Sequence, residues 1–141
     1  MGNGTLKLAV MMNPFGEWDK SKGDHHTDLE IEEDEWCELF YKVLGIPERW
    51  KDVDGQLEPV DFSETQFKEI LTGKGYPMLG RIWFMYRDAN YLPSEVNQLL
   101  EECLKVQKKT DNVYGLSALG KLIAACYEAI KINSGLCLLS D

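Results

Sequence analysis

The chain has 141 residues, of which 44% are hydrophobic and 28% are charged, and its formal net charge is −9. This length suits one globular domain, and this composition excludes a disordered chain and a collagen-like fibre. No apolar run reaches the roughly 18 residues that a membrane span needs, and the apolar stretch near the N-terminus is too short for the secretory signal of an exported protein.

The acidic excess lies entirely in the first 62 residues. That part contains fifteen acidic and six basic side chains, whereas residues 63–141 contain nine of each. Because an acidic field repels phosphate groups, we expect neither nucleic acid nor an anionic membrane as a direct partner. A basic protein is the expected partner, since complementary charge accelerates encounter. The alternative is that the charge only keeps the protein soluble.

The four cysteines are widely spaced and form no CxxC pair; they are Cys37, Cys103, Cys126 and Cys137. This spacing predicts reduced thiols in a cytoplasmic protein rather than a disulfide framework or a zinc site. Three of the four fall on apolar faces of expected elements, where a thiol behaves as a small buried hydrophobic group.

The N-terminal part is expected to hold a strand, a long loop and a helix. Residues 5–12 (TLKLAVMM) are short and apolar, which predicts a buried strand. Residues 13–28 are rich in polar side chains, Gly and Pro, and predict a loop of the length that is often functional. Over residues 32–44 the apolar positions have helical spacing, with Trp36 on the buried face. The acids at 32–35 occupy the first turn, where the helix dipole favours them, and most should face solvent.

The middle of the chain is divided by turn signals. Residues 46–62 predict irregular structure with a turn at Asp54-Gly55. Ser63 and Gln66 have the spacing of a capping box, which predicts a short helix that ends near Gly73. Residues 76–87 are compatible with a strand or a helix, and we favour a helix because their apolar positions follow helical spacing.

The last third is expected to hold two long helices and a strand. Ser94 is the expected N-cap of an amphipathic helix, and a broader apolar helix follows Asn112. The apolar run at 136–139 predicts a buried strand that pairs with the N-terminal strand. The chain is thus expected to form one α+β domain over residues 1–141, with four or five helices packed on a small sheet made largely from its two ends.

Two patterns raise the question of metal chemistry. The segment around Asp54-Gly55 has part of the pattern of an EF-hand calcium loop, but its first ligand position would be Trp50, so we expect an ordinary turn. His25 and His26 are the only histidines and stand beside acidic residues. With no nucleophile-elbow or phosphate-loop motif in the chain, we predict no catalytic residue, no metal and no cofactor.

We therefore predict a small cytoplasmic protein-interaction module that binds a basic partner through its acidic N-terminal region. Aromatic anchors among charges are typical of such interfaces. The residues expected to bind the partner are Trp18, Asp28, Glu30, Glu32 and Glu33. Small acidic immunity proteins, which inhibit toxic nucleases, share this size and charge, a comparison of composition alone. The alternatives are a metal-dependent enzyme or metal-binding protein that uses His25 and His26, and a structural subunit that forms a homodimer.

Overall fold

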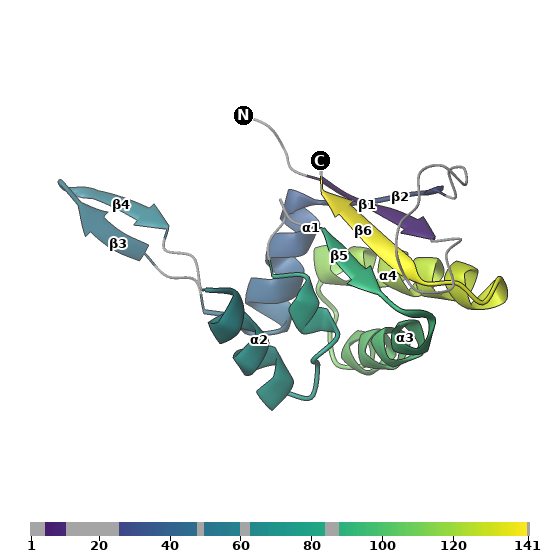
Figure 1. Cartoon of the computed structure of the whole chain (residues 1–141). Helices are drawn as coiled ribbons and strands as arrows, with labels where there is room; N and C mark the ends of the chain where they lie inside the picture. Colours follow the sequence, from purple (N-terminus) through teal and green to yellow (C-terminus); the bar gives the residue numbers. More distant parts are fainter. Residues whose placement is uncertain (1–4, 11–25, 48–49, 60–62, 84–87, 141) are drawn as a thin grey trace.

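The structure is a computed structural model that describes residues 5–10, 26–47, 50–59, 63–83 and 88–140 (Figure 1). In this part of the chain, four α-helices accompany a four-stranded antiparallel sheet and a separate two-stranded hairpin. The predicted α+β fold class is confirmed. The helices α3 and α4 lie along the sheet, and α1 stands at its end (Figure 1).

The sheet has the strand order β2-β1-β6-β5. The two chain ends form its centre, because β1 (Thr5–Val10) pairs antiparallel with β6 (Leu136–Ser140), with Leu8 opposite Leu138. This confirms the pairing expected from the two apolar runs. The flanking strands β2 (His26–Glu32) and β5 (Ala89–Tyr91) were not predicted.

Strand β2 corrects the prediction of a loop up to residue 28, because the strand already begins at His26. It is an edge strand of the sheet and has only one neighbouring strand, β1. An edge position tolerates a largely polar sequence. Ile31 is buried whereas its neighbours Glu30 and Glu32 are exposed, the alternation of a half-buried strand. A register shift separates the pair Lys7–Glu30 from the pair Ala9–His26, and Asp28 falls inside it.

The helix predicted over residues 32–44 is present as two joined pieces. The α-helix α1 (Glu33–Cys37) runs directly into the π-helix η2 (Glu38–Val43). Trp36 is buried as predicted and donates from Nε1 to the Ile82 carbonyl at 3.0 Å. Gly45 ends the helix with φ +73°, the left-handed conformation that glycine adopts at little cost.

The prediction of irregular structure over residues 46–62 is wrong for residues 50–59. This stretch forms a hairpin of β3 (Trp50–Val53) and β4 (Gln56–Pro59). Asp54 and Gly55 both have positive φ, at +52° and +81°, as a two-residue hairpin turn requires. The Asp-Gly turn is therefore confirmed, and it closes a hairpin rather than a calcium loop.

The capping box that opens α2 (Glu64–Gly73) is confirmed, since Gln66 N–H donates to Ser63 Oγ and Ser63 N–H donates to Gln66 Oε1. The helix predicted over residues 76–87 is wrong for residues 76–83, where only the short 3₁₀ turn η3 (Leu79–Arg81) forms. Residues 84–87 lie outside the described part of the chain.

Tertiary hydrogen bonds explain why residues 76–83 do not form a regular helix. Glu102 is 3% exposed, and its carboxylate accepts from the N–H groups of Met78 and Leu79 at 3.0 Å. The hydroxyl of Tyr91 donates to the Met78 carbonyl at 2.7 Å. These side chains satisfy backbone groups that an α-helix would otherwise have satisfied.

The two long helices are α3 (Pro93–Gln107) and α4 (Val113–Lys131). Pro93 occupies the first turn of α3 and Leu92 is the N-cap, which corrects the assignment of Ser94 to that place. The Asn112 side chain caps α4 by accepting from Gly115 N–H at 2.8 Å. Within the core, α4 packs on α3, on the sheet and on α1 and η2.

By length and composition alone, α4 would qualify as a membrane span. In the structure, however, seven of its residues are buried inside the protein, and Lys121 near its middle is ion-paired with Glu35. Both features are typical of the core helix of a folded domain.

Candidate functional site

Four of the five residues predicted to bind a partner lie in the described part of the chain. Asp28, Glu30 and Glu32 belong to β2, and Glu33 is the first residue of α1. Trp18 lies outside the described residues. The structure thus brings Glu30, Glu32 and Glu33 together at the junction of the two elements.

A fourth acid joins them at this junction. Asp34, which was not among the predicted binding residues, is exposed, as are Glu30 and Glu32, whereas Glu33 is half-buried. We call these four residues the acidic segment: Glu30, Glu32, Glu33 and Asp34. Among the described residues, none of the four carboxylates takes part in an ion pair. The segment therefore presents acidic side chains to solvent, and in the strand register Lys7 of β1 lies opposite Glu30.

Glu35, the next residue, behaves differently because it is only 4% exposed. Its carboxylate accepts from Lys121 Nζ at 2.7 Å, from Glu32 N–H at 2.9 Å and from the Ser117 hydroxyl. Burial raises the pKa of Glu35, but these hydrogen bonds outweigh burial, so the pKa lies below its ordinary value. Glu35 is thus an internal anchor that joins α1 to α4.

Lys121 holds the acidic segment from inside the protein. Besides binding Glu35, its ammonium donates to the Glu30 backbone carbonyl at 2.7 Å. One side chain of α4 thus binds both the backbone of β2 and the Glu35 side chain of α1. Because the Lys121 ammonium is bound to Glu35 and to the Glu30 carbonyl, it forms no ion pair with the four carboxylates of the acidic segment.

The alternative site at His25 and His26 lies largely outside the described residues. His25 lies outside the described residues, and His26 is the first residue of β2. The described part of the chain contains no group of three or more His, Cys, Asp or Glu side chains that could hold a metal ion. The use of the two histidines therefore stays a prediction.

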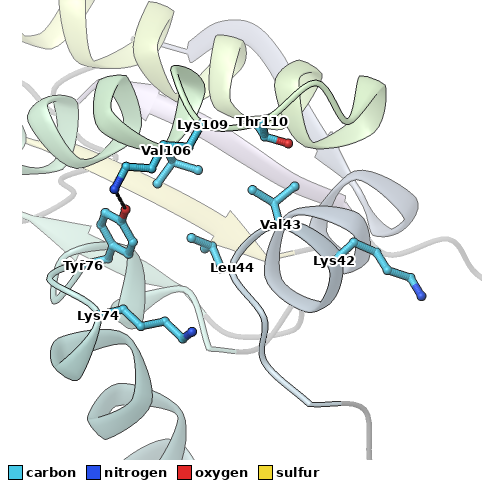
Figure 2. Close-up of a pocket in the computed structure, with 8 residues that line it drawn as sticks. All are labelled: Lys42, Val43, Leu44, Lys74, Tyr76, Val106, Lys109 and Thr110. Carbon is cyan, nitrogen blue, oxygen red and sulfur yellow. Dashed lines mark hydrogen bonds between the residues drawn. The ribbon is translucent and has the colours of Figure 1, made fainter.

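A second feature, which the sequence analysis missed, is a cavity of about 450 Å³ where three helical elements end (Figure 2). Its polar lining comes from the end of η2, the end of α2 and the end of α3. A lysine at or just beyond a helix C-terminus was the available signal, but the spacing of these lysines along the chain gave no reason to join the three helix ends. The lining residues are Lys42, Val43, Leu44, Lys74, Tyr76, Val106, Lys109 and Thr110.

Comparisons with protein-family models, with curated proteins and with solved structures found no match.

Proposed function

We propose that the protein is an interaction module that binds a basic protein through the acidic segment. The observation that carries this proposal is that Glu30, Glu32 and Asp34 are exposed at alternate positions of the chain, while the ammonium of Lys121 is engaged by Glu35 and by the Glu30 carbonyl. Exposed charges of one sign attract an oppositely charged partner from a distance and increase the rate of encounter.

The internal ion pair supports the same proposal. A recognition surface binds with less loss of conformational entropy when its backbone is already fixed. The hydrogen bonds of Lys121 to Glu35 and to the Glu30 carbonyl fix the backbone on both sides of Glu32. These hydrogen bonds tie the segment to α4, which favours a preformed docking surface.

The class of partner follows from the sign of this charge. A cationic protein, such as a nucleic-acid-binding enzyme that carries its own basic surface, has the complementary chemistry. Inhibition of such an enzyme, as an immunity protein would perform it in the cytoplasm, is the form of the function that we propose. Trp18 and Asp28 are proposed as additional contacts on the sequence grounds given above.

The test is affinity capture from an extract of the native cell with three forms of the purified protein. The first is the wild type, the second is Glu30→Gln/Glu32→Gln/Asp34→Asn, and the third is the control Glu69→Gln/Glu101→Gln/Glu128→Gln. The control changes the net charge by the same amount at three other exposed carboxylates. We expect a basic protein that the wild type and the control retain and that the second form loses.

Two outcomes would contradict the proposal. One is equal retention of every captured protein by all three forms. The other is equal loss in both variants, since this would mean that total charge, and not the acidic segment, governs the interaction. Melting temperatures of the three forms establish that each is folded.

A further inference from the structure

The cavity at the helix ends concentrates positive charge in an otherwise acidic protein. Lys42 lies in the last turn of η2, Lys74 is the C-cap of α2, and Lys109 follows the end of α3. The side chain of Lys74 extends to Gly45, just after the end of η2. A Cβ added at Gly45 would lie 3.4 Å from Lys74 Nζ. Figure 2 shows Lys74 and Lys109 bordering the cavity, with Lys42 directed away from its centre.

The balance of charge at the cavity is positive. A helix C-terminus carries about half a negative charge, so three helix ends offset part, but not all, of the charge of the two ammonium groups of Lys74 and Lys109. None of the lining residues is acidic. The exposed Asp111 follows the lining residue Thr110, but the exposed Lys105 and Lys108 stand on the last turns of the same α3 and outnumber it.

The lining also offers neutral hydrogen-bond donors. Lys109 Nζ donates to the Tyr76 hydroxyl oxygen at 3.5 Å, and the dashed line in Figure 2 marks this contact. Within the described part of the chain, the Tyr76 hydroxyl proton has no acceptor, so it can be donated into the cavity. Thr110 adds a second hydroxyl. The other walls are apolar: Val43, Leu44 and Val106.

We propose that this cavity binds a small phosphorylated molecule. A phosphate would accept from the ammonium groups of Lys74 and Lys109 and from the Tyr76 hydroxyl, and lysine is a common phosphate ligand. The apolar walls would contact the organic part of the molecule. The volume of about 450 Å³ lies within the usual range of roughly 300–1,000 Å³ for small-molecule sites. This site shares no residue with the acidic segment, so the proposal does not depend on the proposed basic partner.

The competing explanation is that each lysine only stabilises the helix end from which it projects. In that case removal of a lysine would lower the melting temperature, but it would have no effect on a bound anion. Binding is therefore the informative quantity.

The test is titration calorimetry with inorganic phosphate, pyrophosphate and citrate at constant ionic strength. The pocket variant is Lys74→Gln/Lys109→Gln, and the control is Lys105→Gln/Lys108→Gln, which removes the same charge from exposed positions outside the lining. We expect the wild type to bind one pyrophosphate, more tightly than phosphate or citrate. Affinity should fall about tenfold or more in the pocket variant and stay within about twofold in the control.

A second variant keeps the test decisive if the pocket variant does not fold. Tyr76→Phe removes only the hydroxyl, and it should weaken pyrophosphate binding by about threefold. The proposal is overturned if about 10 mM pyrophosphate gives no saturable binding, if citrate binds more tightly than pyrophosphate, or if the pocket and control variants lose affinity equally.

Discussion

The ammonium of Lys121 on α4 lies 2.7 Å from the Glu35 carboxylate of α1, and the two side chains are 28% and 6% exposed. This pair connects the acidic segment to the helix that packs on both the sheet and α3. An ion pair this buried depends on both partners, because removal of one leaves the other charge without compensation.

Removal of Lys121 should therefore destabilise the protein. We expect Lys121→Ala to lower the free energy of unfolding by about 2 kcal/mol, less than for a fully buried pair because the lysine is partly exposed. Lys68→Ala is the control, since its pair with Glu64 is exposed on both sides and should contribute less than about 0.5 kcal/mol. Urea unfolding of the two variants measures both values, and equal losses would contradict the structural role of Lys121.

The pH dependence of stability should have opposite signs at Glu35 and Glu102. The pKa of Glu35 is lowered in the folded state, so its contribution is present above a pH of about 4.5 and is lost on acidification. Burial raises the pKa of Glu102 and outweighs the hydrogen bonds from Leu79 and Met78, so its charged form costs stability as the pH rises through that pKa.

Urea unfolding between about pH 3 and pH 7 separates the two groups. The wild-type stability minus that of Glu35→Gln should increase with pH, because the charged form of Glu35 is the stabilising one. The same difference for Glu102→Gln should decrease with pH. If both stability differences change in the same direction with pH, the environment described for Glu35 or for Glu102 is wrong.

Two glycines of α4 should respond in opposite ways to substitution by alanine. A Cβ at Gly115 would lie 2.7 Å from Val43 Cγ2, which belongs to a stiff β-branched side chain, whereas a Cβ at Gly120 would meet nothing within 4 Å. We expect Gly115→Ala to lower the free energy of unfolding by about 1–3 kcal/mol. Gly120→Ala should raise it by up to about 1 kcal/mol through its higher helix propensity. Melting temperatures distinguish these outcomes, and a stable Gly115→Ala would mean that η2 and α4 lie further apart.

Three of the four thiols should be protected in the folded protein. Cys103, Cys126 and Cys137 are buried, and burial raises the pKa of Cys126 and of Cys137 to about 12. Because the thiolate is the reactive form, these thiols should react with a disulfide reagent only when the protein unfolds. Cys37 is partly exposed and should react first. Rapid reaction of two or more thiols in native buffer would contradict this packing.

Local patterns were sufficient for the elements whose signals lie within a few residues of one another. The apolar runs at the chain ends, the Ser63–Gln66 capping box and the Asp54-Gly55 turn all have the predicted structure. The groups of the capping box and of the turn are near neighbours in the chain. The two apolar runs each predict a strand by composition, and their pairing follows because each buried strand needs a neighbour, although β1 also pairs with β2 and β6 also pairs with β5.

The remaining elements depend on contacts between residues distant in the sequence. The backbone of residues 76–83 is held by Glu102 and Tyr91, which are 24 and 13 residues from Met78, and no local spacing reveals these contacts. Strand β2 has few apolar residues, because an edge strand needs few of them to pack against the core. Glu35 is indistinguishable in sequence from its acidic neighbours, and only the position of Lys121 shows that it is internal.

The most direct test of the proposed function is the association rate of the purified basic partner, measured by stopped-flow fluorescence from about 20 mM to 500 mM salt. We expect a steep decrease with salt for the wild type and for Glu69→Gln/Glu101→Gln/Glu128→Gln. We expect a slower and much less salt-dependent rate for Glu30→Gln/Glu32→Gln/Asp34→Asn. A wild-type rate that does not change with salt, or the same dependence in all three forms, would contradict recognition through the acidic segment.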